Sequence, residues 1–513
     1  MLVVGAGPVG LAVATQATLS GATVRIVERC PGPRPWAPAL AVQPGTLETL
    51  DRLGVADELL QRSVDHVDLR VHVAGATLRG RMHDLDLPDT RYRRIVFAPQ
   101  PVVENVLRRR LAGLGVEVEW GTELVGLAQG ESSVAVNVRG ADGRRQTLSA
   151  QYLVGCDGRD STVRPAAAIR FPGGTHRQTI AVGDVRLSPG VEPGAAHAFI
   201  GGGGILFLFP LPSGAWRLIA PHRGNREPDV ATLVGAATGG SARVSEIEHL
   251  ESFTPVHRLA DRYRAGRVFI AGDAAHAHSP AAAQGMNVGI QDAVDLGWKL
   301  GFAASGAPDA LLDTYERERR PVARRVIRLT RLAYALEVSE NRLLSLGRRL
   351  VARPVAALLL GRPRLLSRVA RVVSGLDVRY RTGAVDRARV RWGGIHPGRR
   401  LPYLGSADGP GDHFPIDAAA FHLLVFDDSV PLATVADLED RHSAVLTVHG
   451  VDRPVARGRK GRKWPQVVLV RPDGYVAVVG DAADIGAVDR YLARWVSPDR
   501  PAGTAWPRSA EVA

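Results

Sequence analysis

The sequence predicts an α/β fold: a Rossmann-like domain interrupted by a mixed β-sheet and followed by a C-terminal α/β domain. Three observations support this prediction. The first thirty residues follow the order strand, glycine-rich turn, helix, strand. Residues 169–260 consist of short β-like runs separated by glycine and proline clusters, and a further alternation of strands and helices begins near Gly398. A chain of 513 residues is also too long for one compact core.

The first of these units is a strand at 2–4, a helix at about 9–20 and a strand at 23–28. A crossover helix is what connects two parallel strands, so this unit predicts a parallel sheet. The other predicted elements are, in chain order, a helix at 101–113, an alternating segment at 117–138, an apolar strand at 152–156, β-like runs at 197–200, 205–209 and 216–220, a buried strand at 267–271, a helix at 285–302, arginine-rich helices at 309–373 and strands at 421–426, 443–448 and 466–470. The proline-rich tail from Ser497 is expected to be poorly ordered.

Composition and charge narrow the classes of function. No window approaches the roughly 18 to 20 uninterrupted apolar residues of a spanning helix, so an integral membrane protein is excluded. The net charge of +13 would suit nucleic-acid binding, but only three of the 65 basic residues are lysine, and the arginines are scattered over helices. We interpret the excess as a bias toward arginine and expect neither a nucleic-acid nor a membrane partner. The basic run at 457–463 is interpreted as a solvated loop.

Cysteine usage and the first residues of the chain bear on location. Cys30 and Cys156 lie far apart with no CxxC pairing, which excludes a disulfide framework. Cys156 is interpreted as a small core residue, and nothing requires Cys30 to react. The chain shows no signal-peptide pattern and begins inside a strand, so we expect a cytoplasmic location.

The sharpest local motif is LVVGAGPVG at residues 2–10. Gly5 permits a tight strand-to-helix turn, Gly7 lets a pyrophosphate approach the backbone, and Gly10 allows close packing of the helix on the strand. Glu28, at the end of the next strand, is placed to accept hydrogen bonds from a ribose. The coincidence of strand, helix and acid predicts a dinucleotide site, but it does not distinguish FAD from NAD.

Two later segments supply that distinction. GCDGRDSTVR at 155–164 follows an apolar strand and places Asp157 and Gly158 on a loop that enters a helix. RVFIAGDAAHAHSP at 267–280 repeats the arrangement with Gly272 and Asp273, and QGMNVGIQDAVDLGWKL follows at 284–300.

With these three motifs in this order, the chain resembles the class A FAD-dependent aromatic hydroxylases of the para-hydroxybenzoate hydroxylase fold. It is most similar to the branch of polyketide hydroxylases and rifampicin monooxygenases. The resemblance covers essentially the whole chain, including SGLDVRY at 374–380 and RPDGYVAVV at 471–479. It implies an FAD-binding domain in two parts (1–168 and 261–392, the second with a helical segment), an inserted mixed β-sheet substrate domain (169–260) and a thioredoxin-like C-terminal domain (393–513).

The resemblance also implies which residues contact the cofactor. In the family, the DG loop, which here contains Asp157 and Gly158, serves both FAD and NAD(P)H. The aspartate of the GD motif, here Asp273 after Gly272, binds the ribityl chain. Gln100 matches a glutamine that touches the flavin, and the segment after Pro280 matches the loop over the flavin ring. The full set of expected cofactor-binding residues is Gly5, Gly7, Pro8, Val9, Gly10, Glu28, Arg29, Gln100, Asp157, Gly158, Gly272, Asp273, Pro280, Gly285, Met286 and Asn287. His276 and His278 are interpreted as structural, and no metal site is expected.

The chain departs from the family pattern at two places beside the expected flavin. Pro38 and Gly45 stand where relatives carry arginine, which puts nicotinamide docking or flavin positioning in doubt, and Arg34 is the nearby arginine that could substitute. Ala282 and Ala283 stand where relatives carry glycine, and their methyl groups restrict the backbone. Related chains also have several residues ahead of the first strand, so we expect Met1 to be a truncated or misassigned start.

The activity that the resemblance implies is hydroxylation of an aromatic, polyketide-type substrate by FAD, oxygen and NADPH or NADH, in natural-product biosynthesis. No dedicated acid–base pair is evident, so the catalytic residues are left unassigned; the cofactor performs the bond making while the protein positions the ring and excludes water. The substrate is expected between the inserted sheet and the flavin, against residues 197–209 and 216–221, with a roomy aliphatic wall because only 5% of residues are aromatic.

Several alternatives stay open. Baeyer–Villiger or ring-rearranging oxygenation uses the same cofactor, and antibiotic inactivation is an alternative on substrate grounds. A halogenase is disfavoured because WxWxIP is absent, and the nearest string, WGGIHP, does not fit. A non-catalytic flavin-binding protein is the alternative from another class. The C-terminal domain has no cysteine, which excludes thiol chemistry there and leaves packing or homodimer formation as its expected role.

Overall fold

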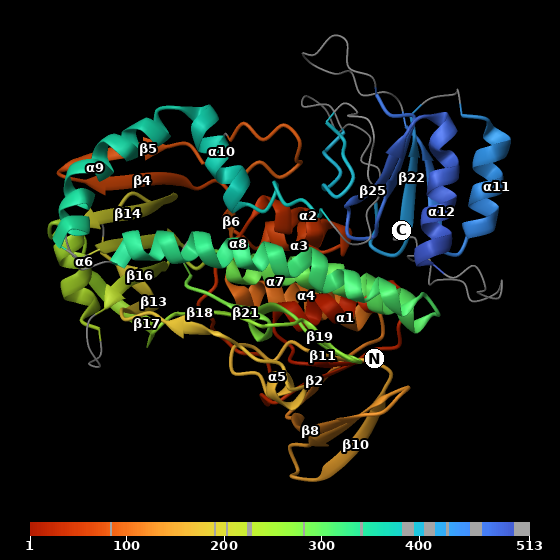
Figure 1. Ribbon diagram of the computed structural model, residues 1–513. Coiled ribbons are helices and arrows are strands. Elements are labelled where there is room, and N and C mark those ends of the chain that lie inside the picture. The colour runs from red at the N-terminus through yellow and green to blue at the C-terminus, as the bar shows by residue number, and fades with distance from the viewer. Residues whose placement is uncertain are drawn as a thin grey trace.

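The computed structural model has the α/β architecture that the sequence predicts, with helices α1 and α7 between an inserted sheet on one side and a C-terminal unit on the other, and with α8 extending over the inserted sheet (Figure 1). It describes residues 1–82, 85–188, 191–201, 204–222, 228–280, 283–338, 342–381, 394–404, 416–426, 430–451 and 464–496. The basic run at 457–463, the tail from Ser497 and Ala282 lie outside these residues.

The central sheet has six strands in the order β19-β20-β11-β1-β2-β7. Four neighbouring strands run parallel: β20 (Val268–Ile270), β11 (Leu153–Gly155), β1 (Leu2–Val4) and β2 (Arg25–Glu28). β7 (Val118–Trp120) continues the parallel order, and the short edge strand β19 (Arg264–Ala265) is antiparallel. β1, β11 and β20 are buried along their length, as expected for parallel strands covered on both faces.

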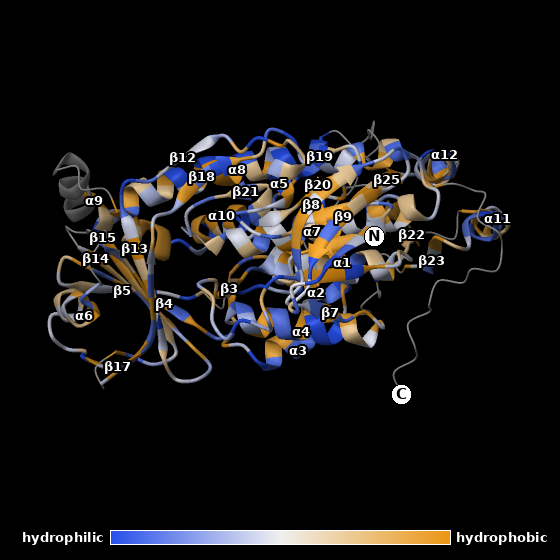
Figure 2. Cartoon of the chain, turned by 90° about the horizontal axis from the view of Figure 1, so that it is seen from below, coloured by the Kyte–Doolittle hydropathy of each residue, from blue (hydrophilic) through white to orange (hydrophobic). Residues whose placement is uncertain are grey.

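Helices α1 (Pro8–Leu19) and α7 (Gly285–Ala304) pack closely against each other, and Figure 2 shows the apolar residues gathered in this region. The contact depends on glycines of α7. A Cβ on Gly297 would come within 2.7 Å of Gln16, and a Cβ on Gly301 would come within 2.6 Å of the Ser20 carbonyl. α1 and α7 therefore approach so closely that a residue larger than glycine at Gly297 or Gly301 would not fit.

In the part of the chain that the structure describes, the inserted sheet has seven strands in the order β17-β13-β16-β15-β14-β4-β5. The first five are β17 (Val244–Phe253), β13 (Thr179–Leu187), β16 (Trp216–His222), β15 (Gly204–Pro210) and β14 (Ala195–Gly201). β4 (Asp68–Val73) and β5 (Ala76–Gly80) come from a segment to which the sequence analysis gave no strand. β4 and β5 belong to this sheet because β4 pairs in parallel with β14, more than a hundred residues later in the chain.

Two helices cover the same face of this inserted sheet. On α8 (Asp313–Val338), Tyr334 and Val338 pack with Ile180 and Val182 of β13. On α9 (Arg342–Leu360), Leu360 lies against Gly80 of β5. Gly80 pairs with Leu69 of β4, and a side chain on Gly80 would point to the same side of the sheet as Leu69. The paired positions of neighbouring strands put Val182 and Leu69 on one side of the sheet. Helix α10 (Pro363–Val373) follows.

Among its described residues, the C-terminal unit has a four-stranded sheet in the order β23-β22-β24-β25 and two helices. β22 (Phe421–Val425) and β23 (Leu446–Gly450) are parallel, and β24 (Val467–Val470) and β25 (Val476–Gly480) extend the sheet antiparallel. The helices are α11 (Leu432–His442) and α12 (Ile485–Trp495). Gln16 of α1 donates to the Ala418 carbonyl at 2.6 Å, which ties this unit to the core.

Smaller elements complete the fold. They are β3 (Ala41–Val42), α2 (Pro44–Arg52), α3 (Ala56–Gln61), β6 (Val96–Phe97), α4 (Gln100–Gly113), β8 (Glu123–Gln129), β9 (Val134–Arg139), β10 (Arg145–Ala150), α5 (Val163–Ala166), β12 (Gly173–Thr175), α6 (Val230–Thr238), β18 (Val256–Leu259) and β21 (His276–Ala277). Among the described residues, no helix is both long enough and apolar enough to cross a membrane.

Candidate functional site

The motifs found in the sequence meet at one edge of the central sheet. Gly5 follows β1, Glu28 ends β2, Asp157 follows β11 and Gly272 follows β20, and these four parallel strands are neighbours. The carboxyl ends of parallel strands form the crevice in which open α/β sheets bind ligands. The topology therefore brings together residues that are up to 267 positions apart in the chain.

The glycine turn between β1 and α1 has the geometry expected of a phosphate cradle. Gly5 has a φ of +103°, which favours glycine, and a side chain there would overlap the Cys156 carbonyl. A side chain on Gly10 would overlap the Gly5 carbonyl. Gly7 differs, because the nearest atom to its side-chain position is Glu104 Oε1 at 4.0 Å. The backbone at Gly7 is thus open on the side where a pyrophosphate would lie.

Glu28 stabilises this turn with both carboxylate oxygens. Oε2 accepts a hydrogen bond from the Ala6 amide at 2.8 Å, and Oε1 accepts one from the Cys30 amide at 3.0 Å. Each oxygen retains acceptor capacity for a ribose hydroxyl. The next residue, Arg29, is exposed.

The first turn of α1 contacts the GD segment directly. Pro8 is the first residue of the helix, where its missing N–H costs nothing. Side chains built at Gly272 and Gly289 would come within 2.7 Å and 2.6 Å of Val9 Cγ2. Val9 therefore fits between Gly272 and Gly289 and sets the distance between the first turn of α1, the GD segment and α7.

Asp157 holds the DG loop with one carboxylate oxygen, and its other oxygen has no hydrogen-bond partner among the described residues. Its Oδ2 accepts hydrogen bonds from the amides of Thr162 at 2.7 Å and Val163 at 3.0 Å, while Oδ1 is buried without a partner in the described part of the chain. Gly158 has a φ of +82°. Arg164 donates to the Ala274 carbonyl at 2.9 Å, which joins the DG loop to the GD loop.

Asp273 follows Gly272 beyond the carboxyl end of β20, and the space beside it at this edge of the sheet is here called the recess. The residue is exposed, yet enough protein surrounds its carboxyl that burial raises its pKa against the opposing charges of His276 and Arg159. A side chain that is accessible but closely surrounded suits a polar ligand that replaces water there.

The N-terminus of α7 lies beside this recess and is held by Asn287. Its Oδ1 accepts from the Gln43 amide at 2.9 Å, and its Nδ2 donates to the carbonyls of Ala41 at 2.9 Å and Ala283 at 2.7 Å. Gln284 precedes the helix without a side-chain cap on the first turn. The amides of Gly285, Met286 and Asn287 thus form the positive end of a twenty-residue helix.

The loop before α7 contains a strained alanine. Ala283 stands at one of the two positions where relatives carry glycine, and its φ of +50° is a conformation that glycine adopts freely. Its amide donates to the Pro280 carbonyl at 2.9 Å. The sequence predicts that the methyl group restricts the backbone, and the structure holds Ala283 in the left-handed region.

The two histidines of the GD segment make structural contacts. His276 Nε2 lies 2.5 Å from Asp292 Oδ2, and Arg319 Nε donates to Asp292 Oδ1 at 2.6 Å. His278 Nδ1 lies 2.9 Å from the Ser279 carbonyl, and burial lowers the pKa of His278 to about 4.

The structure gives a different reason for the absence of arginine at each of the two positions, Pro38 and Gly45. A side chain on Gly45 would come within 2.6 Å of the Ser374 carbonyl, so this helix start has no room for arginine. At the other position, the inserted sheet supplies a guanidinium: Arg217 donates to the carbonyls of Ala37 at 2.9 Å and Pro38 at 2.6 Å.

The Arg217 side chain is itself fixed by an aspartate. Arg217 is 1% exposed, and its Nε and Nη2 donate to Asp184, which also accepts from Trp36 Nε1 at 2.7 Å. Arg34, the substitute considered from the sequence, instead contacts Cys30 Sγ at 3.5 Å, on the side of Glu28.

Glu104 is a further candidate site residue, which was not predicted from the sequence. Gln100 Nε2 donates to Glu104 Oε1 at 2.7 Å, and that same oxygen faces the open side of Gly7. Burial raises the pKa of Glu104, and the neighbouring Glu28 acts in the same direction. The signal available was its position four residues after Gln100 on one helix, which places both side chains on one face.

One face of the inserted sheet lies next to these loops. Ile205, Phe207 and Phe209 alternate along β15 and are half-buried, and the paired positions put them on the same face as Ile219 and Arg217. The apolar cluster of Phe209 contains Leu40, Ala41 and Ala283 of the loops around the recess. The opposite face packs on α6.

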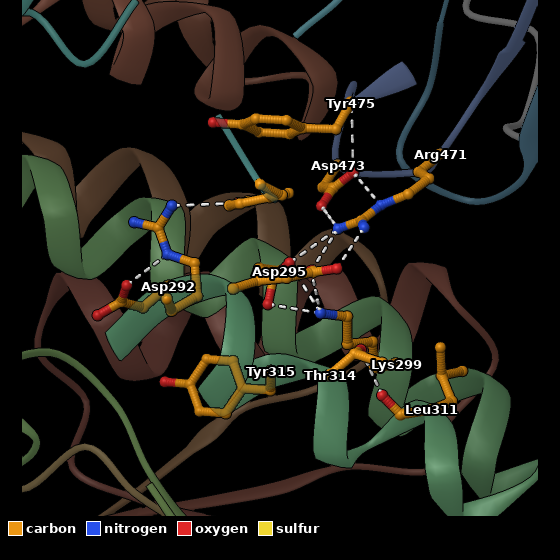
Figure 3. A network of polar contacts seen from close by, with 12 residues as sticks. Asp292, Asp295, Lys299, Leu311, Thr314, Tyr315, Arg471, Asp473 and Tyr475 are labelled. Carbon is orange, nitrogen blue, oxygen red and sulfur yellow. Dashed lines mark hydrogen bonds and ion pairs between the residues drawn. The ribbon is translucent and has the colours of Figure 1, made fainter. Parts of the chain in front are cut away.

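A second group of acids lies deep in the protein, between α7, α8 and the C-terminal unit (Figure 3). Asp295, Glu318 and Asp473 are close enough together to hold a metal ion. Arg471, however, donates to all three, and Lys299 donates to Asp295 and Glu318 at 2.8 Å and 2.6 Å. The cations already occupy the centre of this cluster, so we interpret it as an internal ion network.

Comparison with known proteins agrees with this geometry. Residues 1–330 match the family described as FAD binding domain, and residues 395–499 match the family described as aromatic-ring hydroxylase, C-terminal. The chain is 35% identical to 6-methylpretetramide 4-monooxygenase of Streptomyces rimosus, over 94% of this chain and 90% of that protein. It is 32% identical to a rifampicin monooxygenase of Streptomyces venezuelae, over 94% and 95%. The solved structure of OxyS anhydrotetracycline hydroxylase from Streptomyces rimosus has a TM-score of 0.77 at 31% identity, with coverage of 96% and 98%.

Proposed function

Because the chain belongs to the family of FAD-dependent aromatic-ring hydroxylases, we propose that it is a monooxygenase that hydroxylates an aromatic polyketide-type substrate in natural-product biosynthesis, with NADPH or NADH as reductant. The observation that carries this proposal is the position of the apolar face of the inserted sheet. Phe209 shares a cluster with Ala283, three residues after the proline at which the flavin loop begins. A substrate between that face and the recess would lie beside the N-terminus of α7.

The residues fit an adenine-dinucleotide cofactor. The open backbone at Gly7, the unpartnered oxygen of Asp157 and the accessible carboxyl of Asp273 are features that a bound FAD would use. We assign FAD binding to the sixteen residues named from the sequence and add Glu104. Gly5 and Gly10 shape the turn, Glu28 accepts from the ribose, and Asp273 accepts from the ribityl chain.

FAD, when bound, supplies the transfer of electrons from NAD(P)H to oxygen and the delivery of one oxygen atom to the ring. The chain positions and shields this chemistry. The first-turn amides of α7 stabilise negative charge beside them. Phe207 and Phe209 offer an apolar wall that excludes water, and Arg217 holds the loop at Ala37 and Pro38 against that wall.

The proposed division of labour follows the domain boundaries expected from the sequence. Residues 1–168 and 261–392 would hold FAD, residues 169–260 together with β4 and β5 would hold the substrate, and residues 393–513 would serve packing or formation of a homodimer. The names of two relatives give 6-methylpretetramide and rifampicin as the compounds on which they act. We propose an aromatic substrate of comparable size for this chain.

The test uses the purified full chain with added FAD. We expect a flavin absorbance spectrum, and NADPH consumption that a tetracyclic aromatic stimulates with formation of a product one oxygen heavier. Phe209→Leu should raise the KM for the aromatic, while Phe199→Leu, on the opposite face of the same sheet, should not. Failure to bind FAD, or equal effects of the two variants, contradicts the proposal.

Two further measurements test the assignment of the FAD site and distinguish ring hydroxylation from Baeyer–Villiger insertion. Asp273→Asn should weaken FAD binding by about tenfold or more through loss of a charge-assisted hydrogen bond. Asp160→Asn, at an exposed acid of the DG loop, serves as the control. The carbon skeleton of the product, determined by NMR, distinguishes ring hydroxylation from Baeyer–Villiger insertion, because both add one oxygen atom.

A further inference from the structure

The arginine-rich helices carry most of the net charge of the protein. Residues 313–373 contain fifteen arginines and five acidic residues, a net charge of +10 out of +13 for the whole chain. In the sequence alone, these arginines look scattered over the helices. In the structure, a subset of them lies on the outward side of two helices that cover the same face of the inserted sheet.

This outward side also exposes large apolar residues, which is unusual for a helix surface in contact with water. Leu332 is 63% exposed and Val351 is 53% exposed. The full set, here called the arginine–leucine face, is Leu329, Leu332 and Leu336 of α8, Val351, Val355 and Leu358 of α9, and the exposed arginines Arg324, Arg328, Arg331 and Arg353.

The spacing of these residues shows that the apolar ones form stripes. Positions 329, 332 and 336 of α8 and positions 351, 355 and 358 of α9 are separated by three or four residues, so each set lies along one side of its helix. Exposed apolar stripes rimmed by polar residues mark an interaction surface.

From this face we propose that the protein docks on an anionic lipid surface through α8 and α9. Basic amphipathic helices bind in the plane of a membrane interface when leucine and valine enter the acyl boundary and arginine contacts anionic headgroups. The long arginine side chains can bury their methylene stems and keep the guanidinium at the headgroup level. This docking is peripheral and does not require a spanning helix.

Two observations favour lipid over a protein partner. A second copy of the chain would bring two clusters of arginine together, which like-charge repulsion opposes. The exposed residues described on α8 and α9 include no aromatic side chain, whereas protein interfaces depend on tryptophan, tyrosine and arginine anchors. Leucine, valine and arginine without aromatics suit a fluid surface better than a shaped one.

The experiment is vesicle flotation of the full chain carrying FAD. The protein should float with vesicles of phosphatidylcholine mixed with phosphatidylglycerol and not with phosphatidylcholine alone. Binding should disappear in 1 M salt, where the Debye length is about 3 Å. Equal binding to both vesicles, or no binding to the anionic ones at low salt, overturns the proposal.

Matched variants locate the surface. Arg324→Gln with Arg328→Gln should weaken binding by roughly 30-fold, at about 1 kcal/mol for each arginine. Leu332→Gln with Leu336→Gln should weaken it by on the order of tenfold or more. Arg325 is left intact because it pairs with Asp377 at 2.6 Å.

The controls change the same residue types outside the face. Leu432→Gln alters an exposed leucine of α11, and Arg144→Gln alters an exposed arginine between β9 and β10. Both should bind vesicles like the parent. If these controls lose binding equally, or if sedimentation shows a dimer that Leu332→Gln with Leu336→Gln dissociates, the face is not a lipid-docking surface and the proposal is wrong.

Discussion

The buried ion network offers the sharpest test of how the C-terminal unit is held to the core. Arg471 is fully buried and donates to Glu318 Oε1 at 2.8 Å, to Asp295 Oδ1 at 2.9 Å and to Asp473 Oδ1 at 3.0 Å (Figure 3). Three carboxyl groups contact two cations, Arg471 and Lys299. Burial raises the pKa of Asp295 well above its usual range.

Replacing Arg471 by leucine removes at least five charge-assisted hydrogen bonds and leaves the three buried carboxyl groups with Lys299 as their remaining cationic partner. Removal of one partner from a buried ion pair costs about 3 to 5 kcal/mol, because the remaining charge cannot recover its hydration. We expect the free energy of unfolding to fall by that amount. Equilibrium urea unfolding, followed by tryptophan fluorescence, measures it, since Trp298 lies under the guanidinium.

Arg441→Leu is the matched control. Arg441 also contacts two carboxylates, Asp437 at 3.0 Å and Asp489 at 2.7 Å, but its side chain is 47% exposed. Water screens such pairs, so we expect a loss of about 1 kcal/mol or less. Glu318→Gln in the Arg471→Leu background should restore part of the stability, because it removes one uncompensated charge. A loss for Arg471→Leu no larger than that for Arg441→Leu would falsify the reasoning.

Three further predictions concern single positions. Burial raises the pKa of Glu337 from 4.5 to about 7, so the stability that its protonated form contributes is present below pH 4.5 and is lost as the pH rises to about 7. The loss should be about 3 kcal/mol in urea titrations and absent in Glu337→Gln, and parallel pH profiles would contradict it. Arg217→Lys keeps the charge but cannot reach Asp184 and both carbonyls at once; the free energy of unfolding should fall by about 2 kcal/mol, and an unchanged urea midpoint would refute this. Ala283→Gly should raise the free energy of unfolding by about 0.5 to 1 kcal/mol through relief of its positive φ, whereas Ala335→Gly in an exposed turn of α8 should lower it by about 1 kcal/mol; destabilisation by both would show that Ala283 is unstrained.

The sequence by itself determined the elements whose signals are local. The glycine turn at residues 5–10 requires a positive φ and close backbone approach, and an apolar strand on each side of its helix leaves few other folds. Glu28, Asp157 and Asp273 each follow a recognisable strand, so their convergence at one sheet edge could be predicted from parallel topology. FAD and the family followed from the order of the three motifs.

Tertiary structure alone decided what depends on contacts between distant segments. The pairing of β4 with β14, the approach of Arg217 to Pro38, and the facing of Glu104 to Gly7 have no local pattern, because each joins chain segments brought together only by folding. The same reason applies to Arg471, whose partners on α7 and α8 lie more than 150 residues earlier in the chain. Side-chain composition fixes which residues can pair, but burial and the distance between elements decide which of them do.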